Sequence, residues 1–423
     1  MNRPWWAPAL LLAAWLSPLA PAWGAAGRVV FVEGAVSAQA ADGTLRLLGT
    51  GAEVAVGDRI RTGSRSHALL EFDDGSKVTV RPGSVFVVER YRHGGDRGEA
   101  LFALLKGGLR ALTGAISKLR PDAFQVRTPV ATLGIRGTEF DARLCEDDCA
   151  REERQGAGAL AGRVALQRGS LEARDVTGRV RPLAEGAAVQ PGDTLTTGAD
   201  AFAVIFFRDG TRVTLQPESS FVVQDYRYDP AEASTSRVFF NLLRGGLRAL
   251  TGALAKINRP AFQVRTPTAT IGVRGTGFDV YHRNPTWTRV WIGRIEFRTA
   301  GGTLVVEKDQ TVFLPDAGGK PVILPKVPVF FRKLPGPRPD KVGVDPKKLF
   351  GGRAVRPGLW VYVRRGRVRL GGPRPVVLTA GQSGYANGRQ ALRLQVVPVF
   401  MLTDPTPLPG ATPLSAPLSC EVR

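Results

Sequence analysis

The sequence predicts an all-β protein, built from tandem twisted β-sandwich or β-solenoid-like domains with a C-terminal β unit and a proline-rich linker. Its 423 residues include 50 glycines and 31 prolines, which separate short runs rich in valine and leucine. Strands bounded by tight turns need this pattern, whereas long helices do not tolerate it. A chain of about 400 residues also exceeds what one hydrophobic core usually serves. A long internal repeat then divides the chain into domains.

The N-terminus has the features of a secretory signal peptide. A positive charge at Arg3 precedes an apolar run from Trp5 to about Ala20, and small residues follow. The run is too short for a membrane-spanning helix, which needs about 20 apolar residues, and prolines interrupt it. We therefore expect the protein in the periplasm or secreted, with cleavage after Gly24 or, nearly as well, after Ala26.

The net charge of +21 has two interpretations. In an exported protein, a basic surface would bind an anionic surface polymer or lipid head groups, and we expect no nucleic-acid partner. The basic residues are, however, mostly arginines spread through both halves of the chain, which favours dispersed, solvated charge. The mature chain is expected to be peripheral to a membrane at most.

Three cysteines are present, and two of them are close together in the sequence. We predict a small-loop disulfide between Cys145 and Cys149, because export makes oxidation plausible. Free thiols and a metal clip are the alternatives, but the spacing is not that of a zinc site and no histidine lies near. Cys420 is left over, and whether it is paired stays open.

The repeat covers residues 27–141 and returns at about 162–279. The Gly57-Asp58, Asp74-Gly75 and Phe86-Val87-Val88 segments recur 135 residues later, and the Gly107 to Gly114 and Phe124 to Pro129 segments recur 138 residues later. The change of three residues falls between Tyr91 and Leu101, where we expect an exposed loop.

Within each copy the pattern is that of strands. Alternating residues such as Val78-Thr79-Val80 directly follow the Asp74-Gly75 turn, which predicts hairpins. The segment from Leu101 to Lys118 is ambiguous, because its leucines fit an amphipathic helix while glycines interrupt them at about 1 kcal/mol each. Two strands or one kinked strand is favoured over a short helix.

These patterns predict the domain boundaries. The expected order is a signal peptide at 1–24, a first domain at 25–145, a linker at 146–161, a second domain at 162–282, a β extension at 283–326, a Pro/Lys-rich linker at 327–356, a third small β unit at 357–400 and a Pro-rich tail at 401–423.

One motif is more specific than the rest. The stretch from Thr128 to Phe140 reads T-P-V-A-T-L-G-I-R-G-T-E-F, and the second copy carries its equivalent from Thr266 to Phe278. This signature, with an upstream Gly-Asp turn and a hairpin, resembles the FecR domain family, and both copies together cover about 60% of the chain. The resemblance implies an all-β periplasmic domain that, in iron-siderophore signalling, receives a signal from an outer-membrane transporter and controls a sigma factor. We expect this chain to have no cytoplasmic N-terminal segment and no internal membrane helix, so that it does not itself contact a sigma factor.

The signature residues are the candidate site, in a structural or a binding role. They are Arg127, Thr128, Pro129, Gly134, Arg136, Gly137 and Thr138 in the first copy, and Arg265, Thr266, Pro267, Gly272, Arg274, Gly275 and Thr276 in the second. Glycines on both sides of Arg136 permit close backbone approach, and a guanidinium suits carboxylate or phosphate. The alternative is an internal ion pair with Asp141, matched by one between Arg274 and Asp279, which would make Arg136→Ala lower the melting temperature.

Nothing in the sequence indicates an enzyme. The histidines at 67, 93 and 282 do not recur between the copies, and no nucleophile, metal or nucleotide motif is present in a suitable context. We expect no catalytic residue, no cofactor and no metal. The function predicted is a protein-interaction or signal-sensing module with an envelope protein partner, acting in envelope or iron-transport signalling. The alternative is a basic envelope scaffold or adhesin that binds anionic polymer.

Overall fold

The computed structural model describes residues 25–120, 122–156, 159–230, 232, 235–257, 261–273, 275–350 and 354–410. The predicted signal peptide, Arg274 and Cys420 lie outside these residues. Strands account for 51% of the structure, which confirms the all-β prediction. No helix among the described residues is long and apolar enough to cross a membrane.

The strands form two separate sheets. The first contains β1 (Ala25–Glu33), β2 (Val36–Gln39), β3 (Leu45–Leu47), β4 (Glu53–Ala55), β5 (Arg59–Thr62), β6 (His67–Phe72), β7 (Lys77–Val80), β8 (Val85–Arg92), β9 (Glu99–Leu112), β10 (Phe124–Arg127), β11 (Thr132–Cys145), β29 (Gly358–Leu370), β30 (Val376–Thr379), β31 (Ser383–Ala386) and β32 (Ala391–Arg393).

The second sheet is formed by one continuous stretch of chain. It contains β12 (Gly162–Arg168), β13 (Leu171–Arg174), β14 (Val180–Pro182), β15 (Ala188–Val189), β16 (Thr194–Thr197), β17 (Phe202–Phe207), β18 (Arg212–Leu215), β19 (Ser220–Arg227), β20 (Arg237–Leu250), β21 (Phe262–Arg265), β22 (Thr270–Val273), β23 (Gly277–His282), β24 (Thr286–Ile292), β25 (Arg294–Thr299), β26 (Gly302–Glu307), β27 (Thr311–Leu314) and β28 (Val322–Leu324).

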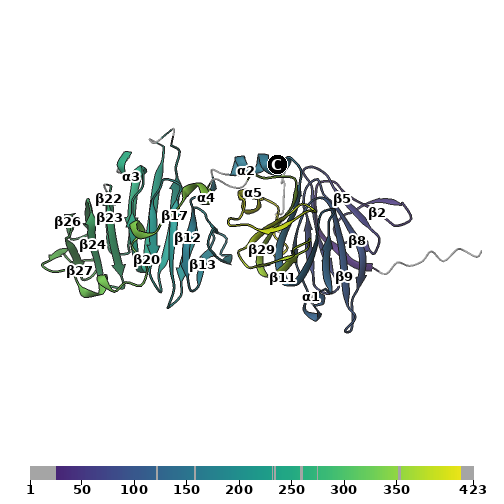
Figure 1. Cartoon of the computed structure of the whole chain (residues 1–423), viewed down its shortest axis with the longest axis horizontal. Coiled ribbons are helices and arrows are strands. Elements are labelled where there is room, and N and C mark those ends of the chain that lie inside the picture. The colour runs from purple at the N-terminus through teal and green to yellow at the C-terminus, as the bar shows by residue number, and fades with distance from the viewer. Residues whose placement is uncertain are drawn as a thin grey trace, which may run out of the picture.

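Short helices connect or cover the strands. They are α1 (Ile116–Leu119), α2 (Asp148–Gly156), α3 (Leu254–Ile257), α4 (Pro346–Phe350), α5 (Val399–Leu402) and the 3-10 turns η3 (Val329–Arg332) and η4 (Pro339–Lys341). The two sheet systems lie end to end along the long axis of the molecule, with β13 of the second facing the β29 side of the first (Figure 1).

Each sheet folds over on itself around one long strand. The first half of β20 pairs with β19 and β21, and its second half pairs with β18 and β23. Among the described residues, every strand pair is antiparallel except β9 with β10 and β20 with β21. Because side chains alternate between the two faces of a strand, each folded sheet encloses one face. The enclosed face holds the core, which includes Phe102 and Phe124 in the first domain and Phe240 and Phe262 in the second.

The ambiguous segment of the first copy forms one strand followed by one helical turn. β9 is continuous through the glycine pair, and Gly107 adopts a φ of +77°, a conformation that favours glycine. A side chain there would also meet the backbone of Ser84, with its Cα 2.8 Å from the added carbon. α1 begins four residues after β9 ends. Both the favoured strand and the alternative helix are therefore present, each over part of the segment.

The predicted third β unit is not a separate unit. β29 pairs with β11 from Leu133 opposite Leu370 to Cys145 opposite Gly358, so it continues the first sheet. Leu359, Val361 and Val368 are fully buried in the core of the first domain. The prediction of independence was wrong because β11 has a long edge that needs a partner, and β29 supplies the matching apolar face.

The repeat extends further than the sequence comparison indicated. Val290 N–H donates to the Gln310 carbonyl at 3.0 Å, and Val363 N–H donates to the Gln382 carbonyl at 3.0 Å. The sequence V-P-V-F also occurs at both 327–330 and 397–400. Residues 358–407 thus repeat 286–337, and the second domain is inserted between the two parts of the first.

The predicted linker and tail belong to this repeat. In the 327–356 segment, Gly336 N–H donates to Gln216 Oε1 at 2.9 Å, so this stretch packs on the second domain. In the tail, the Asp404 carboxylate binds Arg81 with Nη2 to Oδ1 at 2.9 Å. Its described part, up to Gly410, packs on the first domain. Proline-rich composition indicated free chain, but extended chain also packs where side chains of a sheet satisfy its backbone groups.

A disulfide links the last residue of β11, in the first domain, to α2. Cys145 and Cys149 are bonded, with their Cα atoms 5.7 Å apart. The predicted 146–161 linker therefore contains a helix tied to β11. Arg143 adds ion pairs to Asp148 at 2.7 Å and Glu152 at 3.0 Å, which hold α2 against the strand.

Candidate functional site

The threonines of the signature are structural. The Thr128 hydroxyl accepts the Ala131 N–H at 3.1 Å and donates to the Ala131 carbonyl at 2.8 Å, which closes the turn between β10 and β11 around Pro129. Thr266 accepts the Ala269 N–H at 3.0 Å in the corresponding turn, which contains Pro267. These residues shape the turn and present no free polar group to a ligand.

The second threonine of the signature fastens the next strand. The buried Thr138 hydroxyl donates to the Arg367 carbonyl at 2.9 Å, and the Thr276 hydroxyl donates to the Arg294 carbonyl at 2.8 Å. Gly137 precedes Thr138 with a φ of +54°, and Gly275 has a φ of +62°. These positive values turn the chain so that the threonine enters the core side.

The predicted ion pair between Arg136 and Asp141 is absent. Arg136 is exposed and forms no ion pair with any described residue, whereas Asp141 is 3% exposed. Ile135 beside Arg136, and Phe140 and Ala142 beside Asp141, all lie in the core, so both charged side chains are on the opposite face of β11. They differ because the chain around Thr406, which is held by Arg110, covers Asp141. Arg274 lies outside the described residues, and its predicted pair with Asp279 is not described.

Asp141 instead joins a buried cluster of charges that both domains share. Its carboxylate contacts Arg110 at 3.4 Å and Arg364 at 2.6 Å. In the second domain Asp279 contacts Arg248 at 3.2 Å and accepts the Trp291 indole N–H at 3.0 Å.

The arginines of this cluster hold the chain that follows each repeat. Arg248 donates to the carbonyls of Gly336 at 3.0 Å and Phe331 at 3.2 Å, and Arg110 donates to the Thr406 carbonyl in the same manner. Burial raises the pKa of Asp279, and the attraction of Arg248 opposes that rise. The sequence carried a signal for this cluster, since Arg110 and Arg248 lie in the repeated G-G-L-R-A-L-T-G segment.

The outer arginines of the signature lie on the solvent face. Arg127 pairs with Glu89 at 3.1 Å. Arg265 instead donates to Gln263 at 3.1 Å and lies over the Phe239 ring at 5.7 Å. Neither interaction is buried, so each is worth about 1 kcal/mol or less.

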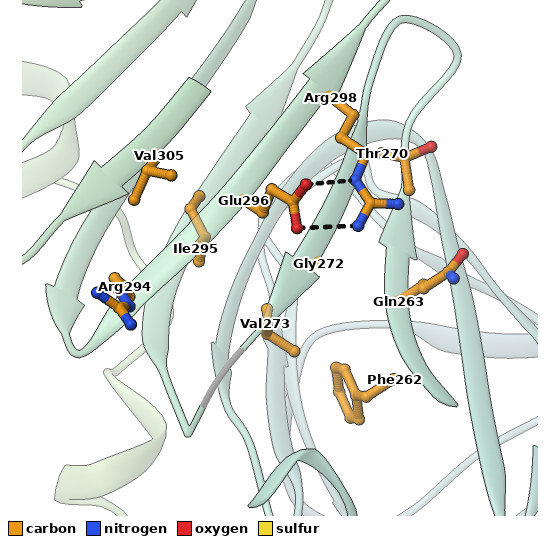
Figure 2. Close-up of a pocket in the computed structure, with 10 residues that line it drawn as sticks. All are labelled: Phe262, Gln263, Thr270, Gly272, Val273, Arg294, Ile295, Glu296, Arg298 and Val305. Carbon is orange, nitrogen blue, oxygen red and sulfur yellow. Dashed lines mark hydrogen bonds and ion pairs between the residues drawn. The ribbon is translucent and has the colours of Figure 1, made fainter. Parts of the chain in front are cut away.

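A shallow trough lies over the signature glycine of the second domain (Figure 2). Its volume is about 490 Å³. Gly272 forms part of the floor, and its cross-strand neighbours are Gln263 and Glu296. The missing side chain of Gly272 leaves the hollow open between these neighbours. The residues around it are Phe262, Gln263, Thr270, Gly272, Val273, Arg294, Ile295, Glu296, Arg298 and Val305.

One exposed ion pair crosses this trough. Arg298 donates to both carboxylate oxygens of Glu296 at 2.9 Å each, as Figure 2 shows. This hydrogen bonding lowers the pKa of Glu296 and raises the pKa of Arg298. The pair makes the centre of the trough nearly neutral.

The corresponding surface of the first domain is basic. Gly134 lies between Gln125 and Arg369, and the position of Arg298 is taken by Gly371, so no equivalent ion pair forms. A hollow of about 680 Å³ next to it is lined by Lys118, Arg136, Gly137, Gly366, Arg367 and Thr379.

We define the basic face as Lys118, Arg136, Arg367 and Arg369. All four side chains are exposed, and none forms an ion pair within the described part of the chain. Arg136 and Arg367 are cross-strand partners, so two like charges lie side by side. Such an arrangement is unfavourable unless an anion or solvent separates the charges, so the basic face can accept an anionic group.

The three histidines do not form a common site. His67 lies near Glu33, with 3.6 Å between Nδ1 and the carboxylate, and His93 is exposed in the loop predicted from the three-residue change. His282 is buried at the end of β23, where its Nδ1 lies 2.7 Å from the Thr286 hydroxyl.

We expect His282 to make stability depend on pH. Burial lowers the pKa of His282 from 6.5, so the unfolded chain binds a proton more readily than the folded protein. The contribution is full above the unfolded pKa and is lost as the pH falls through 6.5 toward the folded value. The free energy of unfolding should therefore decrease between about pH 7.5 and 5.5. Denaturant titrations at several pH values measure this.

The first copy of the repeat provides the control. Its residue at the position of His282 is Leu144, so His282→Leu places the first copy's residue in the second. This variant should show a smaller decrease over the same pH range. An equal decrease in both proteins would assign the effect to other groups.

Comparison with known proteins adds one firm result. A family model described as FecR protein matches residues 58–172 and 193–296, slightly more than half of the chain. The search of curated proteins finds no match.

Three of the solved structures that match share partial similarity with the chain. Two crystal structures of a candidate anti-sigma factor from Parabacteroides distasonis are 14% and 17% identical, with a TM-score of 0.27, and the match covers 33% of this chain and 62% of those. A structure described as a cell surface anchoring domain is 27% identical over 15% of this chain and 82% of its own, with a TM-score of 0.15. The chain thus spans less than two thirds of the anti-sigma factor, and these structures carry no argument about function. Since both copies of the repeat match the family model, the chain belongs to the FecR protein family.

Proposed function

We propose that this protein is a non-enzymatic recognition module of the cell envelope that binds an acidic surface on an envelope protein partner. The observation that carries the proposal is the basic face: four exposed cations on neighbouring elements of the first domain without ion-pair partners in the described chain. The signal peptide predicted at 1–24 supports a periplasmic or secreted location.

The distribution of polar groups supports binding rather than catalysis. The buried charged groups of the signature region are used to fasten strands and the following chain, as at Asp141 and Asp279. The exposed groups lie over open, shallow hollows on a sheet face. A reaction centre positions an acid or base within hydrogen-bond reach of the proton that it transfers, whereas an open surface of this kind suits recognition of a macromolecule.

We expect charge reversal on the basic face to weaken binding. The variant Arg367→Glu/Arg369→Glu replaces two attractive contacts with repulsive ones, and retention of the protein by envelope membranes at low salt should fall by at least about tenfold, equivalent to 1.4 kcal/mol. Co-sedimentation of the purified protein with membranes of the producing cell measures this retention.

A matched control separates the basic face from the overall charge. Arg61→Glu/Arg227→Glu makes the same change in net charge at two exposed strand positions away from this face. It should bind like the wild type. Equal loss in both double variants, or no retention of the wild type, would contradict the proposal.

An anionic surface polymer is the second candidate, and the net charge of +21 favours it. The two ligands respond differently to treatment of the membranes. A protein partner is lost after protease treatment, while a polymer survives it. Binding to a polymer by dispersed charge should also decline steeply between low and moderate salt, because salt screens exposed charges.

A further inference from the structure

The contact between the two domains has two distinct halves. The second domain contributes its N-terminal face, which includes Gly186, and the first domain contributes its C-terminal face, which includes Gln395. Any side chain at Gly186 would collide with the Gln395 carbonyl, so the backbones meet directly. Alongside, Val399 packs with Leu160 and Ala188 in a small apolar cluster, and Arg179 pairs with Glu139.

The repeat places a copy of each half elsewhere on the molecule. The N-terminal face recurs on the first domain, where Gly51 occupies the position of Gly186 with the same backbone conformation, φ +85° against +80°. No described residue has a heavy atom within 4 Å of the position of a Cβ atom on Gly51. Leu45 and Leu47 beside it are 69% and 82% exposed.

A copy of the C-terminal face lies on the second domain, and it is uncovered like the copy of the N-terminal face on the first domain. Val329 occupies the position of Val399, but it is 64% exposed whereas Val399 is 6% exposed. Ile323, which is 37% exposed, places an apolar side chain at the position of Arg393, which is also exposed. The difference between Val399 and Val329 is the cover that the neighbouring domain provides.

The two uncovered faces lie at opposite ends of the molecule. In Figure 1 the hairpin with β2 is at one end of the long axis, and β26 and β27 are at the other, while the covered pair of faces is in the middle. Both domains present their faces in the same order along the axis. A second molecule added at either end would therefore repeat the contact already present within the chain.

We propose that a second copy of this chain covers these faces, with the Leu45, Leu47 and Gly51 face of one molecule on the Val329 and Ile323 face of the next. The faces differ, so the contact is heterologous and does not close, and head-to-tail chains form. The two faces also carry opposite charges. Glu53 is on one face, at the position that Ala188 has in the internal contact, and Lys326 is on the other, at the position of Val396. The internal contact includes the ion pair between Arg179 and Glu139. Thr44 and Gly277 are at the equivalent positions of the intermolecular contact and cannot form this pair, so that contact is weaker.

Single substitutions at each face test the proposal. Glu53→Lys and Val329→Asp change the charge of one face each, at positions whose counterparts Ala188 and Val399 are 3% and 6% exposed in the internal contact. Glu53 and Val329 are both exposed in one molecule, so the fold tolerates these changes. The mature wild type should increase in mean mass by at least twofold between about 1 µM and 100 µM in sedimentation velocity, a range typical of weak association. Each variant alone should stay monomeric.

Mixing the two variants gives the decisive result. Each variant keeps one intact face, so an equimolar mixture can form one contact per pair and should give dimers without larger species. Val176→Asp, at a residue 82% exposed and away from both faces, should associate like the wild type. A monomeric wild type at the highest concentration, dimers of a single variant, or no dimers in the mixture would each overturn the proposal.

Discussion

Replacing Asp141 with alanine is expected to lower the free energy of unfolding of the first domain by about 3–5 kcal/mol, the cost of removing one partner from a buried ion pair. The carboxylate lies between Arg110 and Arg364, and its removal takes the contacting carboxylate from the buried Arg364 and leaves Arg110 with Asp404 at 3.4 Å. Chemical denaturation followed by tryptophan fluorescence measures the loss, since Trp360 lies in the same sheet.

Arg136→Ala is the matched control. Arg136 is exposed and has no ion-pair partner among the described residues, so its loss should change the free energy of unfolding by no more than about 0.5 kcal/mol. Asp279→Ala should destabilise the second domain as Asp141→Ala does the first. If Arg136→Ala were the more damaging variant, the buried cluster would not be the main fastening of the first domain.

A chain that ends at Pro357 should lose the folded first domain while it keeps the second. This truncation removes β29 to β32 and with them six buried side chains: Leu359, Val361, Val363, Val368, Leu370 and Leu378. At about 1.5–3 kcal/mol for each buried side chain, the loss is on the order of 10 kcal/mol, comparable with the whole stability of a domain. Calorimetry should show one unfolding transition, and limited proteolysis should degrade residues before 146 first.

The control truncation ends at Gly410. It keeps every contact that the structure describes, so both domains should unfold as they do in the full-length chain. If the chain ending at Pro357 also kept a folded and protease-resistant first domain, the pairing of β29 with β11 would not be required for stability.

The local features of the fold could be predicted from sequence because they depend on short-range patterns. The Asp74-Gly75 turn is a hairpin in the structure, with Gly75 at a φ of +78°, because that conformation favours glycine. The Cys145 to Cys149 disulfide likewise joins residues that are close in the chain. The repeated segments also predicted the two domains and the family, because each repeated motif is a short stretch of sequence.

The nested arrangement could not be predicted from local pattern. The strand, glycine turn and strand from Leu359 to Val368 were recognised as a unit, but periodicity does not identify a partner that lies more than 200 residues earlier. The shared V-P-V-F segments at 327–330 and 397–400 were the available signal. They show that the proline-rich stretches are equivalent and therefore that each follows one complete domain.

The contacts of the signature arginines could not be predicted without the register between strands. Arg136 is bracketed by glycines, which suggested an internal pair with Asp141, but Arg136 is exposed and lies opposite Arg367 of β29. Arg110 reaches Asp141 because β9 and β11 are neighbouring strands and these two residues are directly opposite. Register between strands that are 30 residues apart decides this contact, and no spacing within the signature encodes it.

Insertion of one domain inside another also fixes the order in which the molecule can be completed. When Cys145 leaves the ribosome, the strand that ends there has no neighbour on one side, and Gly358 is still to be made. The inner body can assemble first, since its chain is continuous, while the outer one waits with an open edge of the kind that promotes aggregation. The part of the protein that is made earliest is therefore the last to be finished.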